Sequence, residues 1–228
     1  MRHARLNRRG PTVLPHWEHR KPWPQWLRAK PLAAACVSLC WAALHALPAM
    51  ADASPKEVVQ DDVLIVNGCP IWPYTRCPGV DLSHAHLVGK NLYGADVRGA
   101  NLTRADLRAS NLAGANLEGA NLTGARLSKA TASNANFSKA RFWGTDLEGA
   151  RMMRADFSGA DFNGASLEIA RLDHAWFVGA RIVGCNLQEA KFNTANLEGA
   201  HFEGNVLIYA LFSGSNTERC PTCPEGAE

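Results

Sequence analysis

The sequence predicts an all-β solenoid, a chain wound into stacked coils, and three observations lead to this prediction. From residue 82 to residue 212 every fifth residue is apolar, giving 27 consecutive apolar positions, mostly Leu or Phe. Neither an α-helix nor a straight strand can bury a period of five, because the side chains would wind around the helix or alternate between strand faces. No proline occurs between Pro78 and Pro221, as expected for a continuous ladder of main-chain hydrogen bonds.

Each repeat has the consensus Ala-[Asn/Asp]-[Leu/Phe]-x-Gly, with the Leu or Phe as its centre. Ala stands two residues before the centre in 21 of 27 repeats, and Gly two residues after it in 15. We expect the centre and the Ala to point inward and the Gly position to form a tight turn with positive φ. Arg154, Ile169 and Glu189 occupy that turn position, so it does not require glycine. Ala132 is the one small centre, and Cys185 replaces an inward Ala, where we expect a small buried hydrophobe.

The segments ANLEGANLTGARL (115–127), GADFNGASL (159–167) and ANLEGAHF (195–202) resemble the pentapeptide-repeat family. The resemblance covers about residues 80–214 and implies a right-handed quadrilateral parallel β-helix with four repeats per coil. The 27 repeats then form just under seven coils. At ~4.8 Å per strand spacing, the stack is roughly 32 Å long.

Residues 1–51 predict a secretory signal peptide with a long basic leader. They contain eight basic residues and one acidic residue. The apolar stretch 32–47 is shorter than the ~20 residues that span a bilayer, and it ends in the small-x-small site Ala49-Met50-Ala51. We expect cleavage near Ala51 and a periplasmic or secreted protein, with an uncleaved anchor as the alternative.

The rest of the chain divides into three segments. We expect an N-terminal cap segment over residues 52–79, the β-helix over 80–214 and a C-terminal tail with the sequence CPTC over 215–228. The apolar run Val63–Val66 predicts a short strand that covers the first coil, because the end of a solenoid otherwise exposes its interior.

Four cysteines flank the repeats, two at each end. The ends are ~30 Å apart, so we expect two local disulfides, Cys69–Cys77 and Cys220–Cys223, in an oxidising compartment. A redox site at Cys220-Pro-Thr-Cys223 is the alternative, but a thioredoxin-like site needs a βαβ unit and a helix N-terminus. We expect no cofactor and no metal, since His201 is the one nearby residue that could complete a zinc site.

The outward positions suggest a binding surface, because residues twenty apart stack when each coil has four repeats. The candidate surface is basic and is partly offset by Asp173; its residues are Arg151, Arg154, Arg171, His174 and Lys191. Outward-pointing Trp143 and Trp176 add a second candidate contact, since exposed Trp can mark an interface. The alternative is a solvated face, because like-charge columns also arise where surface positions are unconstrained.

The last repeats are apolar at outward positions as well. Val206, Ile208 and Leu211 are either covered by the 215–228 tail or form a homodimer contact, as is frequent in the family.

The net charge of +3 conceals two unlike parts, since residues 52–228 hold 16 basic and 20 acidic residues. Residues 80–214 hold 13 of each, whereas family members that mimic duplex DNA and protect gyrase need a strongly acidic rod. We therefore expect no nucleic-acid partner, and the histidines are too scattered to suggest catalysis. The sequence predicts a non-enzymatic, exported structural or interaction scaffold of the cell envelope that binds a protein or an anionic envelope component. The alternatives are a cytoplasmic topoisomerase binder and a redox protein.

Overall fold

The computed structural model describes residues 54–60 and 63–224. The leader, its predicted cleavage site at Ala51 and the last four residues of the tail lie outside the described residues. Within the described ranges the chain forms strands, bridges and turns, and it has no helix that could cross a membrane.

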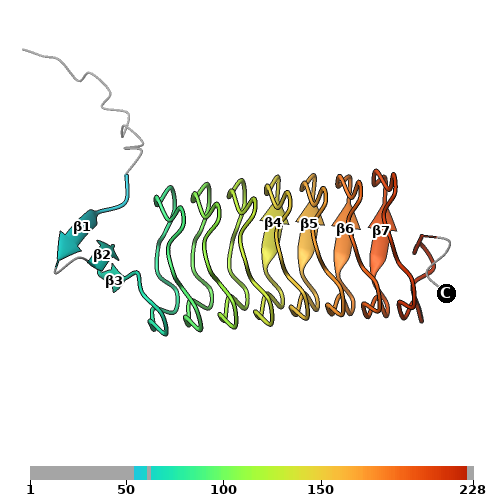
Figure 1. The fold of residues 1–228 in the computed structure, drawn as a ribbon, viewed down its shortest axis with the longest axis horizontal. Coiled ribbons are helices and arrows are strands. Elements are labelled where there is room, and N and C mark those ends of the chain that lie inside the picture. Colours follow the sequence, from blue (N-terminus) through green and yellow to red (C-terminus); the bar gives the residue numbers. More distant parts are fainter. Residues whose placement is uncertain (1–53, 61–62, 225–228) are drawn as a thin grey trace, which may run out of the picture. The chain divides into compact units, whose positions relative to one another are not determined.

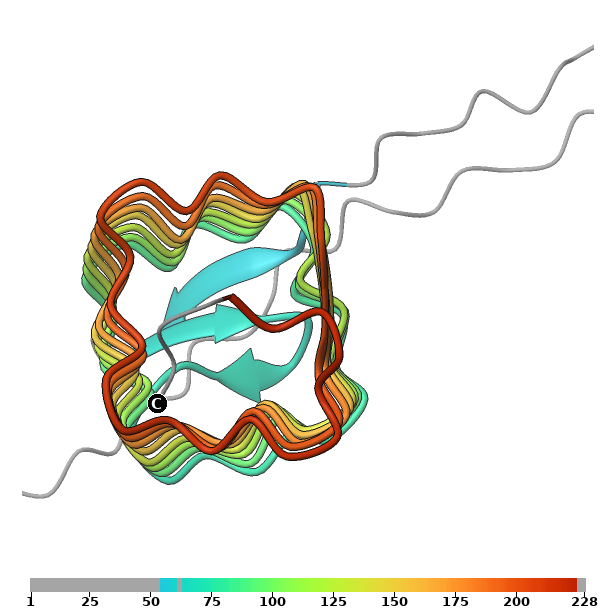
Figure 2. The same cartoon turned by 90° about the vertical axis from the view of Figure 1, so that its right-hand side faces the viewer.

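The repeats wind into a right-handed, four-sided β-helix, which confirms the predicted fold. Parallel bridges join residues twenty apart along the stack, from Arg76↔Asp96 to Asn196↔Asn216, so each coil contains four repeats. Figure 1 shows the coils stacked side by side, and Figure 2, which looks along the stack, shows the square cross-section.

Two sheets contain all the named strands of the described residues. The first is antiparallel, in the order β1 (Glu57–Gln60), β2 (Val63–Val66) and β3 (Cys69–Pro70). The second is parallel and runs along one side of the coils through β4 (Arg141–Trp143), β5 (Asp161–Asn163), β6 (Arg181–Val183) and β7 (His201–Glu203). The other three sides are joined by isolated bridges between successive coils.

The four sides are numbered here as faces by their repeat centres, which recur every twenty residues. Face 1 begins at Leu82 and contains β4 to β7, face 2 begins at Leu87, face 3 at Leu92 and face 4 at Val97. Each face takes the residues from two before to two after its centres.

The interior is a column of buried centres and alanines. Phenylalanines on one face stack across successive coils, with ring centroids 5.2 Å apart for Phe137 and Phe157 and 4.5 Å apart for Phe142 and Phe162. Phe142 also meets Phe157 edge-on at 5.7 Å, across a corner between coils. The small centre Ala132 is buried, as is Cys185.

The turn position has positive φ in every repeat, whether or not it is glycine. Thirty consecutive positions, five residues apart from Tyr74 to Arg219, have φ between 51° and 70°. The Asn or Asp before the centre supports this turn, because its side-chain oxygen accepts the N–H two residues later, as Asn101 does from Thr103 at 3.2 Å.

The turns also show that the coils extend beyond residues 80–214. Tyr74 N already donates to Tyr93 O at 2.7 Å, and Gly199 N donates to Glu218 O at 2.8 Å. Cys77 therefore occupies the position of a repeat centre, and Thr217 does so at the other end. Counting apolar centres misses these repeats because their centres are not aliphatic or Phe residues.

The two ends of the coil are closed differently. At the N-terminal end the buried residues Val66 and Cys69 cover the first coil, and a disulfide joins Cys69 to Cys77. At the C-terminal end a disulfide joins Cys220 to Cys223. These are the pairs expected from the sequence.

The described part of the tail, residues 215–224, leaves the outward apolar residues of the last coil uncovered. Val206, Ile208 and Leu211 remain 46%, 54% and 48% exposed. The described tail residues therefore do not account for these side chains.

Candidate binding face

The register of the coils places five of the candidate residues on face 3. Arg151, Arg171 and Lys191 bridge in succession through their backbones, so they form one column. Arg154 and His174 lie beside it at turn positions, with φ of 58° and 61°. Both side chains are exposed next to the column.

Face 3 has a net charge unlike that of the other faces. Over residues 90–214 it carries one carboxylate, Asp173, and five Lys and Arg residues, a net charge of +4; these are Lys90, Arg151, Arg154, Arg171 and Lys191. Over residues 80–219, faces 2 and 4 each carry three basic and five acidic residues, and face 1 carries three of each. The near-neutral charge of the repeats thus hides one strongly basic side.

The basic residues of the other faces are largely paired within the protein. In the described residues, six of their nine Lys and Arg side chains form ion pairs with carboxylates, such as Arg108 with Asp106 at 2.7 Å. The hydrogen bond from Arg108 lowers the pKa of the Asp106 carboxyl group, and Arg98 acts likewise on Asp96.

On face 3 only one of the five cations has such a partner within the described ranges. Arg171 Nε lies 3.8 Å from Asp173 Oδ2. Four positive side chains of this face are therefore available to an external anion.

A shallow depression of about 500 Å³ opens on the same face. Its wall is formed by residues from three successive coils, namely Ser133, Asn134, Met153, Arg154, Arg171, Asp173 and His174. Asp173 is held in place by Asn193, whose Nδ2 donates to Asp173 Oδ1 at 2.9 Å. His174 Nδ1 lies 2.6 Å from the Thr194 hydroxyl, which belongs to the next coil.

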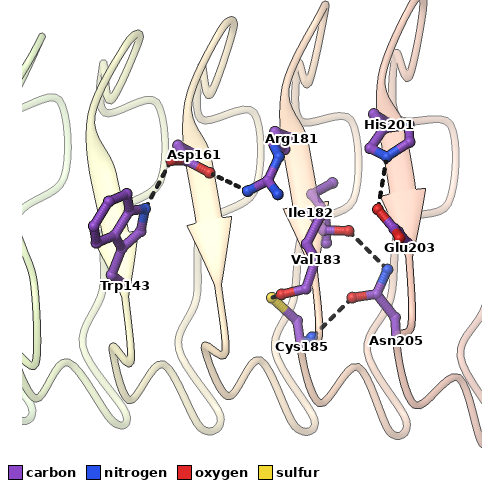
Figure 3. Close-up of polar contacts among 9 residues, drawn as sticks. All are labelled: Trp143, Asp161, Arg181, Ile182, Val183, Cys185, His201, Glu203 and Asn205. Atoms are coloured by element: carbon purple, nitrogen blue, oxygen red, sulfur yellow. Dashed lines mark hydrogen bonds and ion pairs between the residues drawn. The ribbon is translucent and has the colours of Figure 1, made fainter.

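The two candidate tryptophans lie on other faces. Trp176 is on face 4, whereas Trp143 is on face 1, in β4. Trp143 Nε1 donates to Asp161 at 2.7 Å, and Arg181 donates to the same carboxylate at 3.2 Å (Figure 3). The structure therefore does not bring the tryptophans together with the basic column.

The lower part of Figure 3 shows how Asn205 replaces an inward Ala. Its Oδ1 accepts Cys185 N at 2.8 Å and its Nδ2 donates to Ile182 O at 2.8 Å, so it ties two coils together. Cys185 is the free cysteine of the described residues, and burial raises the pKa of its thiol. These contacts stabilise the stacking of neighbouring coils.

Sequence reasoning missed several residues of face 3. Its N-terminal end carries exposed aromatic side chains, Trp72, Tyr74 and Tyr93, and Lys90 lies close to Tyr93 in the sequence. Extending the period of five by two repeats toward the N-terminus would have placed Tyr74 at a turn of this face and Trp72 at the centre of the same repeat.

No cluster of three or more potential metal ligands occurs among the described residues. The fold and the basic side together describe a repeat solenoid that offers side chains on flat outer faces. A family model for pentapeptide repeats matches the chain in eight copies, over residues 75–112, 100–138, 133–168, 170–204 and 185–216. The chain therefore belongs to the pentapeptide-repeat family.

Solved structures of similar proteins include QnrB1 and two proteins described as pentapeptide repeat proteins. QnrB1, a plasmid-mediated fluoroquinolone resistance protein in a trypsin-treated form, is 23% identical over 63% of this chain and 78% of its own, with a TM-score of 0.41. The protein alr5209 from Nostoc PCC 7120 is 32% identical over 46% of this chain and 84% of its own, with a TM-score of 0.32. AT2G44920 from the Arabidopsis thaliana thylakoid lumen is 29% identical over 51% of this chain and 63% of its own, with a TM-score of 0.28. No curated protein matches the chain.

Proposed function

We propose that this protein is a non-catalytic, exported scaffold of the cell envelope whose face 3 binds an anionic envelope component. The observation that carries the proposal is the charge of +4 on face 3, most of it without an ion-pair partner in the described residues. Cations that stabilise the fold are paired with carboxylates, as on the other faces. Cations left without such partners are available to steer and hold an anionic ligand.

Export is supported by two features. The basic leader and the short apolar stretch are typical of a signal peptide. The cysteine pairs that close both ends of the coil are disulfides of the kind that persist in oxidising compartments.

The two alternative functions have less support. A mimic of duplex DNA needs acidic sides, whereas face 3 is positive and face 1 carries no net charge. A redox site at Cys220 and Cys223 needs a feature that lowers the pKa of one thiol, such as a helix N-terminus, and residues 54–60 and 63–224 contain no helix.

We also propose that the C-terminal end meets a second copy of the chain. The half-exposed Val206, Ile208 and Leu211 form an apolar group at the last coil, where the ladder of backbone hydrogen bonds ends. Replacing Ile208 with Asp should shift the protein from dimer to monomer in sedimentation velocity. A wild-type protein that sediments as a monomer at all concentrations would refute the dimer.

One experiment tests export and disulfide formation together. The protein is isolated from its host without reductant, denatured, alkylated at free thiols and weighed by mass spectrometry. We expect a chain without residues 1–51 that carries one alkyl group, on Cys185, because Cys36 and Cys40 leave with the leader. A full-length chain alkylated at all seven cysteines would refute export.

A second experiment tests the binding face. The triple variant Arg151→Gln, Arg171→Gln, Lys191→Gln is compared with Arg126→Gln, Lys129→Gln, Lys139→Gln, which removes the same charge from faces 2 and 4. Retention on a negatively charged cation-exchange matrix should fall much more in the first variant. Equal retention of the two variants would refute a role for face 3.

A further inference from the structure

Resting on the proposed function of face 3, we propose that its ligand is a linear acidic polysaccharide built from uronic acid units. The chain of sugars lies along the stack of coils, from the aromatic group near the N-terminal end to Lys191. The proposal follows from the order in which aromatic, amide and basic side chains succeed one another on this face.

The N-terminal end of face 3 offers flat apolar surfaces. Tyr74 and Tyr93 are 67% and 43% exposed, and Trp72, at the centre position of the same first repeat as Tyr74, is 49% exposed at the end of the stack. The rings of Tyr74 and Tyr93 meet edge to face, with centroids 5.3 Å apart. Rigid aromatic side chains with a polar tip suit the two kinds of surface on a sugar ring, its C–H face and its hydroxyl edge.

Neutral amides follow the aromatic group. Asn111 Nδ2 donates to Asn91 Oδ1 at 3.2 Å, so the two amides form a ladder between coils. Lys90 lies next to Asn91 and adds a cation at this end. Amides that both donate and accept are suited to sugar hydroxyl groups, which do the same.

The basic column follows with one cation per coil. Arg151, Arg171 and Lys191 are in register on neighbouring coils, and the strand spacing sets a step of ~4.8 Å between them. A pyranose unit in an extended 1,4-linked chain advances by about the same length as one coil. Because successive units are rotated about the chain axis, the column meets the carboxylates of those units that face it. From Tyr93 to Lys191 the face extends over about five such steps, roughly 24 Å.

The depression favours a sugar chain over a membrane surface. It is concave and spans three coils, so a sugar ring can enter it, whereas a flat bilayer cannot. Its wall contains the one carboxylate of face 3, Asp173, whose Oδ2 is buried and accepts no hydrogen bond from the described residues. Arg171 lies 3.8 Å from Asp173, whereas Arg154 in the same wall has no carboxylate partner among the described residues, so Arg154 can bind the carboxylate of a sugar unit that enters the depression.

The test is isothermal titration of the mature protein with oligogalacturonides of one to eight units. Affinity should rise with length up to about five units and then level off, because the face spans about five strand spacings. Arg151→Gln combined with Arg171→Gln should weaken binding roughly tenfold, since each substitution removes one exposed ion pair with the ligand. Neutral cello-oligosaccharides of the same length should bind far more weakly.

Aromatic variants separate sugar recognition from simple charge attraction. Tyr93→Ala should weaken oligogalacturonide binding several-fold without changing the binding of polyglutamate, which has carboxylates but no rings. The matched control is Trp176→Ala, which removes an exposed aromatic side chain from face 4 and should leave both affinities unchanged. Circular dichroism melting of each variant shows whether it is folded.

The outcomes distinguish this inference from the proposed function. Tight binding of polyglutamate or of phosphatidylglycerol vesicles, with no dependence on Tyr93 and no preference for oligogalacturonides, would overturn the polysaccharide but retain the anion-binding face. If none of these anions binds, both the inference and the anion-binding face fail.

Discussion

Faces 3 and 4 share one backbone and one interior but present opposite charges. Both have a buried apolar centre in each coil, such as Leu172 on face 3 and Phe157 on face 4. Face 4 is acidic overall and pairs its cations, as Arg98 pairs with Asp96 at 2.8 Å, whereas face 3 is basic and leaves most of its cations without such partners in the described residues. In this fold the inward positions specify the coil, and the outward positions are free to specify a ligand.

The largest expected effect comes from the interior that both faces share. Phe157→Ser removes a ring stacked against Phe137 and Phe177, and Leu172→Ser does the equivalent on face 3. Each should lower the free energy of unfolding by about 3–5 kcal/mol, measured by urea denaturation. If either variant melted like the wild type, that face would have no dry interior behind it.

The next effect concerns the end of the coil, which supports all four faces. Cys69→Ser combined with Cys77→Ser removes the disulfide that joins β3 to the first coil. We expect a loss of about 2 kcal/mol, since the closed loop is short. Wild-type protein melted with reductant should lose at least as much, because reductant also breaks the Cys220–Cys223 disulfide. A variant as stable as the oxidised protein would show that the cap needs no cross-link.

The turns provide a comparison that is independent of charge. Ile169→Gly should stabilise the protein by up to about 1 kcal/mol, because a β-branched residue with φ of 51° is strained. The control is Gly89→Ala, where φ is 65° and no atom lies within 4 Å of the added Cβ. It should destabilise by a similar amount. Thermal melting should show that Ile169→Gly raises stability and Gly89→Ala lowers it. Two changes of the same sign would show that the turn imposes no strain.

The smallest effect concerns acid stability. Arg98 and Arg108 lower the pKa of Asp96 and Asp106 in the folded state, so these carboxylates stabilise the fold at neutral pH. This stabilisation is complete above the ordinary carboxyl pKa. It is lost as the pH falls from there through the lowered pKa values of the folded state. Asp96→Asn combined with Asp106→Asn should therefore flatten the acid limb of a plot of stability against pH. An unchanged limb would show that these pairs do not matter.

Much of the fold could be predicted because the period of five depends only on inward positions. The number of sides could not, since Phe residues fifteen and twenty apart occur almost equally often. The structure explains this: Phe137 and Phe157 stack within one face, while Phe142 and Phe157 touch across a corner. Spacings of fifteen and of twenty residues therefore both bring rings together, and only the backbone register distinguishes three repeats per coil from four.

The candidate site was predictable only in part. The column of Arg151, Arg171 and Lys191 follows from the register once four repeats per coil are assumed. The depression does not, because it depends on how Met153 and Asp173 pack between neighbouring coils. Trp72 also went unrecognised, since it lies before the first aliphatic centre and its repeat breaks the consensus.

The most direct test of this account gives face 3 the charge of face 4 without changing the interior. The triple variant Arg151→Glu, Arg171→Glu, Lys191→Glu is melted and then passed over immobilised polygalacturonate beside the wild type. We expect a melting temperature within a few degrees of the wild type, since surface substitutions usually change stability by less than ~0.5 kcal/mol each, and no retention on the polymer. Wild-type retention by the folded variant would contradict the claim that face 3 is the binding face, and loss of folding would contradict the independence of inner and outer positions.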